Sequence, residues 1–320
     1  MKRLILILTL LLTLSLACAR GGTLPTSTPP TATAPATEAV PTLGMSLLPD
    51  IEESVRVRLD PSLADVTYCT VDGVELKMDV YFPAESSQPL PAVVYVHGGG
   101  WTSGDKGGGV GVQEISALTE KGFVAFSINY RLAPEYRFPA MIEDVKCAIR
   151  SIRAHADGYH VDPNRIGVWG GSAGGHLVSL LGTSDESAGF DVGEYLDYSS
   201  RVQAVVDMFG PVDLTRMFPA AQTRNASQVF SADQLEAASP VTYISADDPP
   251  FLILQGDQDP VVPPEQSQIF YDRLTSANVP ATLVMVKNAG HGFKPMTGKI
   301  DPSRIELTQM IVEFFTKYLK

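Results

Sequence analysis

A serine set between two glycines, in residues 170–174, constrains the fold of this chain more than any other feature. The pattern is Gly-x-Ser-x-Gly around Ser172; an apolar run, residues 165–169, precedes it, and a helix-compatible run, residues 176–181, follows it. A strand that turns sharply into a helix holds such a serine in a strained conformation, and small residues on either side let the two backbones approach. The motif therefore predicts a strand–serine–helix turn with an exposed serine hydroxyl.

Strand and helix patterns alternate along the rest of the chain. Two β-rich runs, residues 66–71 and 76–82, flank Asp72 and Gly73 and predict an antiparallel hairpin at a sheet edge, with a turn slightly longer than two residues. Further strands are predicted at residues 91–96, 123–128, 165–169, 202–209, 251–255 and 281–286, and helices at residues 112–121, from 141, after 172, at 263–277 and at 302–319. This alternation predicts an α/β fold with a mostly parallel central sheet flanked by helices on both faces. Residues 211–248 are less regular, and we expect a small lid or insert there.

Polar residues and glycines follow several of these strands directly. Residues 98–100, Ser172, residues 257–259 and residues 290–292 each come after a predicted strand, so we expect them at the same edge of the sheet. A serine hydroxyl is a weak nucleophile until a base removes its proton, and histidine has a suitable pKa. Of the 5 histidines, only His291 lies in a late strand-to-helix turn between glycines, which predicts it as the base.

The base needs a carboxylate that orients it. Asp257 and Asp259 follow the penultimate strand, and Asp213 follows the strand before that one, so all three are candidates. The chain order Ser172, Asp259, His291 is the serine–acid–histidine order of α/β-hydrolases.

Taken together, four ordered motifs resemble a known family. They are HGGGW at residues 97–101, GGSAGGHL at 170–177, GDQDPVVP at 256–263 and GHGF at 290–293. Residues 55–320 thereby resemble the α/β-hydrolase serine esterases with an HGGG oxyanion motif, and among them the BD-FAE-like branch, which is related to the hormone-sensitive lipase group.

The resemblance implies roles for individual residues. It places the acid at Asp259, two residues before Val-Val-Pro, in preference to Asp257. It implies that the backbone amides of Gly99, Gly100 and Ala173 form the oxyanion hole. In the glycine run, the missing Cβ atoms let the chain approach an oxyanion closely. Trp101, beside this loop, and Phe293, after the base, are expected either to line the substrate pocket or to belong to the core.

The first part of the chain reads as an export signal. Residues 1–18 have a basic start, an apolar run and a lipobox-like end at Cys18, which predict a signal peptide and a lipid on that cysteine. Residues 19–49 are rich in Thr, Pro and Ala and predict an unpacked tether. Residues 50–320 then form the catalytic domain. We expect an exported protein anchored at a bacterial membrane; an ordinary signal peptide and secretion is the alternative.

Composition and motifs limit the partners and cofactors that this protein can bind. A net charge of −12 argues against nucleic acid, because a phosphate backbone requires a basic face. No motif for a metal or nucleotide is present, so no cofactor is expected. An exported protein could pair Cys69 and Cys147 in a disulfide, but the two residues lie in elements far apart in the sequence, and we expect two buried free thiols instead.

Three functions fit these patterns. The first is a serine carboxylesterase acting on short-chain or carbohydrate-linked esters of acetyl or feruloyl type. The second is an amide or peptide hydrolase on the same fold, such as an arylformamidase or exopeptidase. The third, a binding protein built on an inactive hydrolase fold, requires a damaged triad or oxyanion motif, and neither is damaged here.

Overall fold

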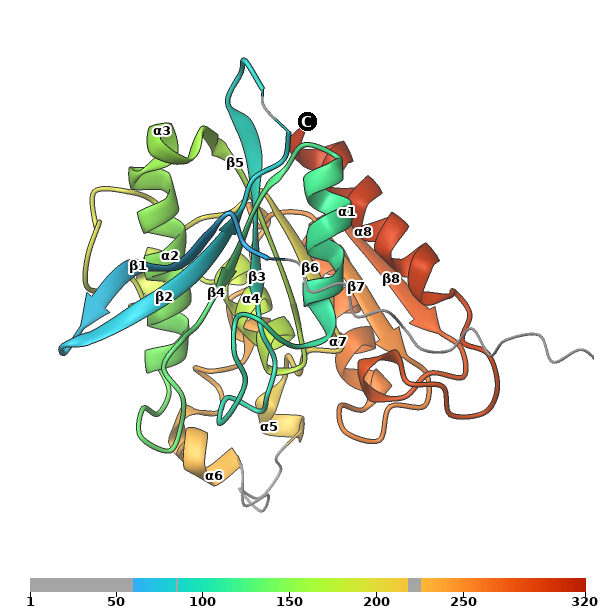
Figure 1. Cartoon of the computed structure of the whole chain (residues 1–320). Helices are drawn as coiled ribbons and strands as arrows, with labels where there is room; N and C mark the ends of the chain where they lie inside the picture. The colour runs from blue at the N-terminus through green and yellow to red at the C-terminus, as the bar shows by residue number, and fades with distance from the viewer. Residues whose placement is uncertain (1–59, 85, 218–225) are drawn as a thin grey trace, which may run out of the picture. The chain divides into compact units, whose positions relative to one another are not determined.

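One mixed sheet organises the protein in the computed structural model, which describes residues 60–84, 86–217 and 226–320 (Figure 1). The predicted signal peptide and tether, with Cys18, lie outside these residues. Within the described part the sheet has 8 strands. Their order across it is β1 (Leu63–Val71), β2 (Val74–Tyr81), β4 (Val124–Ile128), β3 (Leu90–Val96), β5 (Val161–Gly171), β6 (Ala204–Met208), β7 (Phe251–Gly256) and β8 (Ala281–Val286).

The directions of the strands place the loops with the candidate site residues at one edge of the sheet. β1 and β2 form an antiparallel hairpin and β2 pairs antiparallel with β4, whereas every pairing from β4 to β8 is parallel. The carboxyl ends of β3, β5, β7 and β8 therefore meet at one edge, where ligands bind in open α/β sheets. The predicted α/β fold with a mostly parallel sheet is confirmed.

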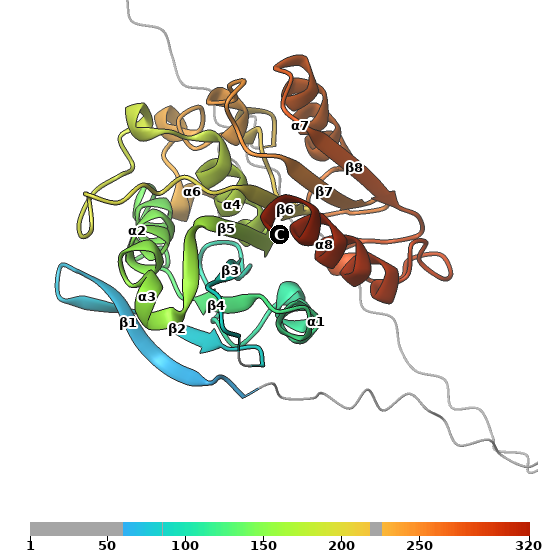
Figure 2. The ribbon, with the colours of Figure 1, turned by 90° about the horizontal axis from the view of Figure 1, so that it is seen from above.

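Helices cover both faces of the sheet (Figure 2). α1 (Glu114–Glu120) and α8 (Arg304–Leu319) pack on one face, while α2 (Ala140–Ala154), α4 (Ala173–Thr183) and α7 (Pro264–Ser276) pack on the other. α8 begins at a capping box, in which Ser303 and Glu306 satisfy each other's backbone amides. Each face thus has its own hydrophobic core.

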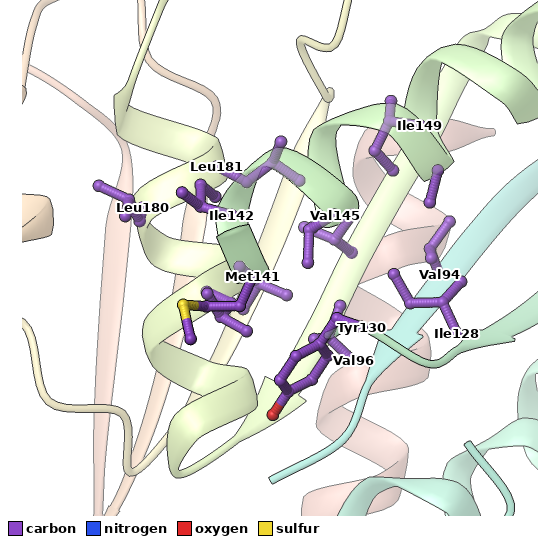
Figure 3. Close-up of a cluster of buried hydrophobic side chains, with 14 of the residues drawn as sticks. Val94, Val96, Ile128, Tyr130, Met141, Ile142, Val145, Ile149, Leu180 and Leu181 are labelled. Carbon is purple, nitrogen blue, oxygen red and sulfur yellow. The ribbon is translucent and has the colours of Figure 1, made fainter. Parts of the chain in front are cut away.

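The helix predicted from residue 141 shows why periodicity locates a core face. Met141, Val145 and Ile149 lie on the side of α2 that faces Val94 of β3 and Ile128 of β4 (Figure 3). All five side chains are fully buried. Apolar residues three and four positions apart share one helix face, and burying that face stabilises the helix against the sheet.

Several local expectations differ from the structure. The hairpin turn is not longer than two residues: Val71 pairs with Val74, and Asp72 and Gly73, with φ of 51° and 83°, form a tight turn. A 3₁₀ helix, Val110–Gln113, precedes α1. Three helices were not predicted, because each is too short to show an apolar periodicity. They are α3 (Ala156–Tyr159) and, in the irregular region 211–248, α5 (Leu214–Met217) and α6 (Ala226–Val229).

The expectation of two free thiols is wrong, because Cys69 of β1 and Cys147 of α2 form a disulfide. The two residues are 78 positions apart in the sequence, but their Cα atoms lie 6.5 Å apart since the edge strand β1 packs along α2. Separation in the sequence was therefore a poor guide to whether these two cysteines are in contact in the folded protein.

α2 also anchors a long surface loop after α4. The ammonium of Lys146 donates to Asp191 Oδ2 at 2.9 Å, and the guanidinium of Arg150 donates to Asp191 Oδ1 at 2.7 Å. Both cationic side chains are only 1% exposed. A single carboxylate thus compensates two buried charges and fixes the loop to the helix.

Candidate active site

Ser172 lies in a sharp turn between β5 and α4, with φ of 57° and ψ of −120°. A Cβ on Gly170 would lie 2.6 Å from the backbone of Gly174, and one on Gly174 would lie 2.1 Å from the carbonyl oxygen of Val96. The amide of Ser172 donates to the carbonyl of Met208 at 2.9 Å. The two motif glycines therefore allow strand, helix and β3 to meet, and the serine backbone is held in a strained position.

Three of the predicted site residues form one hydrogen-bonded chain. His291 Nε2 lies 3.0 Å from Ser172 Oγ, and His291 Nδ1 lies 2.8 Å from Asp259 Oδ2. An ionised carboxylate can only accept, so Nδ1 carries the imidazole proton and Nε2 presents its lone pair to the serine hydroxyl. This is the geometry that serine activation requires.

Asp259 is held by backbone amides as well as by the imidazole. Its Oδ1 accepts from the amides of Val261 and Val262 at 2.8 and 3.0 Å. Burial on its own raises the pKa of Asp259, but hydrogen bonds from His291 and from those two amides outweigh it and hold the pKa below its usual range. The carboxylate therefore stays ionised opposite His291. Gln255 adds a longer contact, Nε2 to Asp259 Oδ2 at 3.4 Å.

The other candidate acids have different partners. Asp257 Oδ1 accepts from the amide of Ala289 at 3.3 Å. Asp213 accepts from the hydroxyl of Thr215 at 2.6 Å and forms an ion pair with Arg216. Among the residues that the structure describes, the carboxylate bonded to His291 is that of Asp259.

The structure gives the remaining four histidines hydrogen-bond partners outside the triad. His97 and His176 are buried, and His97 bonds to the carbonyl of Gly98. His155 bonds to a carbonyl of its own helix, and His160 bonds to the carbonyl of Ser86. The base predicted from the sequence, His291, is therefore the histidine bonded to the serine hydroxyl among the described residues.

The glycine run after β3 lies against the serine turn. A Cβ on Gly98 would lie 2.7 Å from the carbonyl oxygen of Gly171 and 3.5 Å from the Cβ of Ser172. Gly99 has φ of +123°, and its carbonyl accepts from the amides of Thr102 and Ser103 at 3.2 and 3.1 Å. This close approach is open only to residues without a side chain.

Trp101 and Phe293 are core residues. Trp101 is 6% exposed, and its indole NH donates to His176 Nδ1 at 3.1 Å. Phe293 is 2% exposed, and its ring packs edge-to-face on Phe209 at 4.9 Å between centroids. Both side chains belong to the hydrophobic core, which is one of the two places expected for them.

Sequence reasoning overlooked two side chains beside the triad. Phe209 packs edge-to-face against the His291 ring at 4.9 Å, and Gln255 contacts Asp259 from β7. Gln255 could have been found, because it is an amide in an otherwise apolar strand and a buried amide needs partners. For Phe209 the sequence offers no comparable signal.

Over residues 60–84, 86–217 and 226–320, no group of three or more His, Cys, Asp or Glu side chains is placed to hold a metal ion. In the same part of the chain, no helix combines the length and apolar character needed to cross a bilayer.

Strand ends that carry serine, aspartate and histidine in this chain order define an α/β-hydrolase. Within that class the protein belongs to the BD-FAE family, whose model matches residues 78–274.

Relatives in *Mycobacterium tuberculosis* resemble this chain in sequence. The probable carboxylic ester hydrolase LipM is 39% identical over 194 residues, which cover 58% of this chain and 44% of LipM. The esterase LipQ is 31% identical over 268 residues, which cover 80% of this chain and 63% of LipQ. The chain therefore spans less than two thirds of the length of either relative.

Solved structures of esterases have the same fold. A truncated carbohydrate esterase from gut microbiota superposes with a TM-score of 0.68 at 30% identity, covering 81% of this chain and 96% of that one. The apo form of Thermogutta terrifontis esterase 2 superposes with a TM-score of 0.70 at 27% identity. The match covers 82% of this chain and 97% of the esterase chain.

Proposed function

We propose that this protein is a carboxylic ester hydrolase that works through an acyl-enzyme on Ser172. The observation that carries the proposal is the hydrogen-bonded chain from Ser172 Oγ through His291 to Asp259, with distances of 3.0 and 2.8 Å. Membership of the BD-FAE family and similarity to proteins named as ester hydrolases support it.

The proton path follows from the tautomer of His291. Nε2 takes the proton of Ser172 as Oγ attacks the acyl carbon, and the Asp259 carboxylate stabilises the resulting imidazolium. The imidazolium then gives that proton to the oxygen of the leaving alcohol, and the acyl group remains on Oγ. A water molecule, deprotonated by the same Nε2, releases the acid and returns the proton to the serine.

The amides of Gly99, Gly100 and Ala173 are the proposed oxyanion donors. Ala173 is the first residue of α4, and the first amides of a helix have no carbonyl partner within it. The amide of Ser172 is unsuitable because it donates to Met208. Donors on two separate backbones then converge on the oxygen of the attacked carbonyl.

The proposed substrates are short-chain or carbohydrate-linked esters of acetyl or feruloyl type. Support comes from similarity to the gut carbohydrate esterase and to a bifunctional protein of *Bacteroides eggerthii* described as GH43-CE, which is 32% identical over 80% of this chain.

Export with a lipid on Cys18 remains a proposal that rests on residues 1–18 alone. Expression in a bacterial host with an alkyne-labelled fatty acid tests it. Label on the wild-type chain and none on Cys18→Ala is the expected result, and equal labelling of both would refute lipid attachment at this cysteine.

The test of ester hydrolysis is a substrate panel with the full-length chain. Nitrophenyl esters from acetate to decanoate, methyl ferulate, acetylated xylan and an aminoacyl anilide are compared for wild type, Ser172→Ala and Ser179→Ala. Removing a nucleophile lowers kcat by about 10⁶ in a well-studied serine hydrolase, so Ser172→Ala should be inactive. Ser179 is a buried serine of the same helix that lies outside the triad, so Ser179→Ala should keep its activity.

Two outcomes would overturn the proposal. Equal activity of wild type and Ser172→Ala would exclude Ser172 as the nucleophile. Cleavage of the anilide without cleavage of any ester would instead favour an amide or peptide hydrolase.

A further inference from the structure

We propose that Trp101 and His176 form a positioning pair that holds the oxyanion loop against the nucleophile helix. Trp101 directly follows the glycines at residues 98–100, and His176 lies one turn after Ser172 on α4. The inference rests on the proposed ester hydrolysis, and it assigns a role in that reaction to two side chains outside the triad.

The pair is joined by directed hydrogen bonds. The indole NH of Trp101 donates to His176 Nδ1 at 3.1 Å, and His176 Nε2 lies 2.7 Å from the carbonyl oxygen of Ala238. An indole NH can only donate and a carbonyl can only accept. His176 must therefore be unprotonated at Nδ1 and protonated at Nε2, so a single tautomer satisfies both neighbours.

His176 is placed to orient rather than to transfer protons. Its side chain is fully buried. Burial lowers the pKa of His176 to about 4, and the hydrogen bond to Ala238, which favours the charged form, offsets only part of that effect. The imidazole is therefore neutral at physiological pH, and its influence on the reaction passes through Trp101.

Aromatic packing restricts the pair further. The Trp101 ring meets the rings of His176 and Phe230 edge-on, at centroid distances of 5.2 and 5.0 Å. His176 and Phe230 also meet edge-on, at 6.0 Å. Three mutually packed rings in a buried cluster leave the indole one orientation, since rotation would break both the packing and the hydrogen bond.

The backbone of Trp101 explains why this anchor matters. Trp101 has φ of 59°, in the left-handed region that a residue with a large side chain adopts only when its surroundings hold it there. The strained turn follows Gly99 and Gly100, whose amides are two of the proposed donors. The third, Ala173, opens the helix that carries His176. The bond from Trp101 to His176 therefore sets the spacing between donors on two backbones.

The experiment compares Trp101→Phe and His176→Phe with the wild-type full-length enzyme. Each variant keeps an aromatic ring and loses the hydrogen bond between the two side chains. Readouts are kcat and KM for nitrophenyl acetate, and the affinity for an arylboronic acid, whose tetrahedral serine adduct places an oxygen near the oxyanion donors. Loss of a whole donor typically lowers kcat by about 10²–10³, so a displaced loop should lower it by about 10–100-fold.

KM should change by less than about threefold, and boronate affinity should fall by a factor similar to that in kcat, because the loop acts on the tetrahedral species. Unchanged kcat and boronate affinity in both variants would overturn the positioning role.

A matched control separates positioning from general stability. The hydroxyl of Thr183 donates to the carbonyl of Pro240 at 3.1 Å, and so joins α4 to the segment that carries Ala238 without touching the oxyanion loop. Thr183→Val should lose thermal stability and keep kcat. An equal loss of kcat in Thr183→Val and Trp101→Phe would assign the effect to stability and refute the inference.

The unmodified enzyme provides a further measurement should a variant fail to fold. The chain has 2 tryptophans, so its ¹⁵N-labelled form has two indole NH signals. Boronate binding should shift the Trp101 signal, and an unshifted signal at saturation would contradict the inference. Ser172→Ala separates the two proposals. If it is inactive while both pair variants keep full kcat, only the positioning role fails; if it stays active, the proposed function fails.

Discussion

Replacing Asp207 with asparagine tests the electrostatics beneath the serine turn. Asp207 lies in β6 and is fully buried. Its Oδ1 accepts from the amide of Gly210 at 2.8 Å. Burial raises the pKa of this carboxyl from 3.8 to about 7, and hydrogen bonds from the Gly210 amide and the Ser179 side chain offset only part of the rise.

The sign of the pH dependence follows from the proton count. Between pH 4 and 7 the unfolded chain has lost the Asp207 proton while the folded chain retains it, so stability falls by about 1.4 kcal/mol per pH unit. The loss begins near the unfolded pKa and is complete above the folded pKa. Asparagine has nearly the same shape, can accept from Gly210 and does not ionise. The stability of Asp207→Asn relative to wild type should therefore grow by about 3 kcal/mol between pH 5 and pH 8.

Urea unfolding at pH 5, 6, 7 and 8 measures this difference directly. A difference between Asp207→Asn and wild type that stays constant with pH would refute the reasoning, because it would mean that Asp207 ionises alike in both states.

Three further predictions concern the loop, the disulfide and the buried cations. Gly99→Ala should lower kcat by about 10²–10³ and also lower thermal stability, since a Cβ there would lie 2.0 Å from a backbone oxygen of its own loop; full activity would contradict this. Replacing both Cys69 and Cys147 with serine should lower the free energy of unfolding by about 4 kcal/mol, because their bond spans 78 residues; urea unfolding measures it, and an unchanged midpoint would count against the bond. Asp191→Asn should cost about 3–5 kcal/mol in the same assay, because two buried cations of α2 lose their carboxylate; a loss below 1 kcal/mol would show that water reaches them.

Local patterns were sufficient for much of the fold and for part of the site. Continuous apolar runs predicted the strands of the parallel part of the sheet, because a strand buried on both faces needs a continuous apolar stretch. The glycines around Ser172 predicted its turn, because their missing side chains are a local requirement of the backbone. The glycines beside His291 likewise singled out the histidine that reaches the serine.

Contacts between distant segments were beyond the sequence. Local patterns left both Asp257 and Asp259 open as the acid, and only the resemblance to the family favoured Asp259. The path of the turn brings the Asp259 carboxylate to His291. Phe209, which directly follows β6, contacts the ring of His291, and no local sequence pattern around Phe209 predicts that contact.

The sequence by itself determined the alternation of strands and helices along the chain, the turn at Ser172 and the histidine that bonds to this serine. Each of these features depends on residues close together in the chain. Only the tertiary structure decided the bond between Cys69 and Cys147 and the pairing of Trp101 with His176. Those partners lie 78 and 75 residues apart, and packing across the sheet and its loops, rather than any local pattern, brings them together.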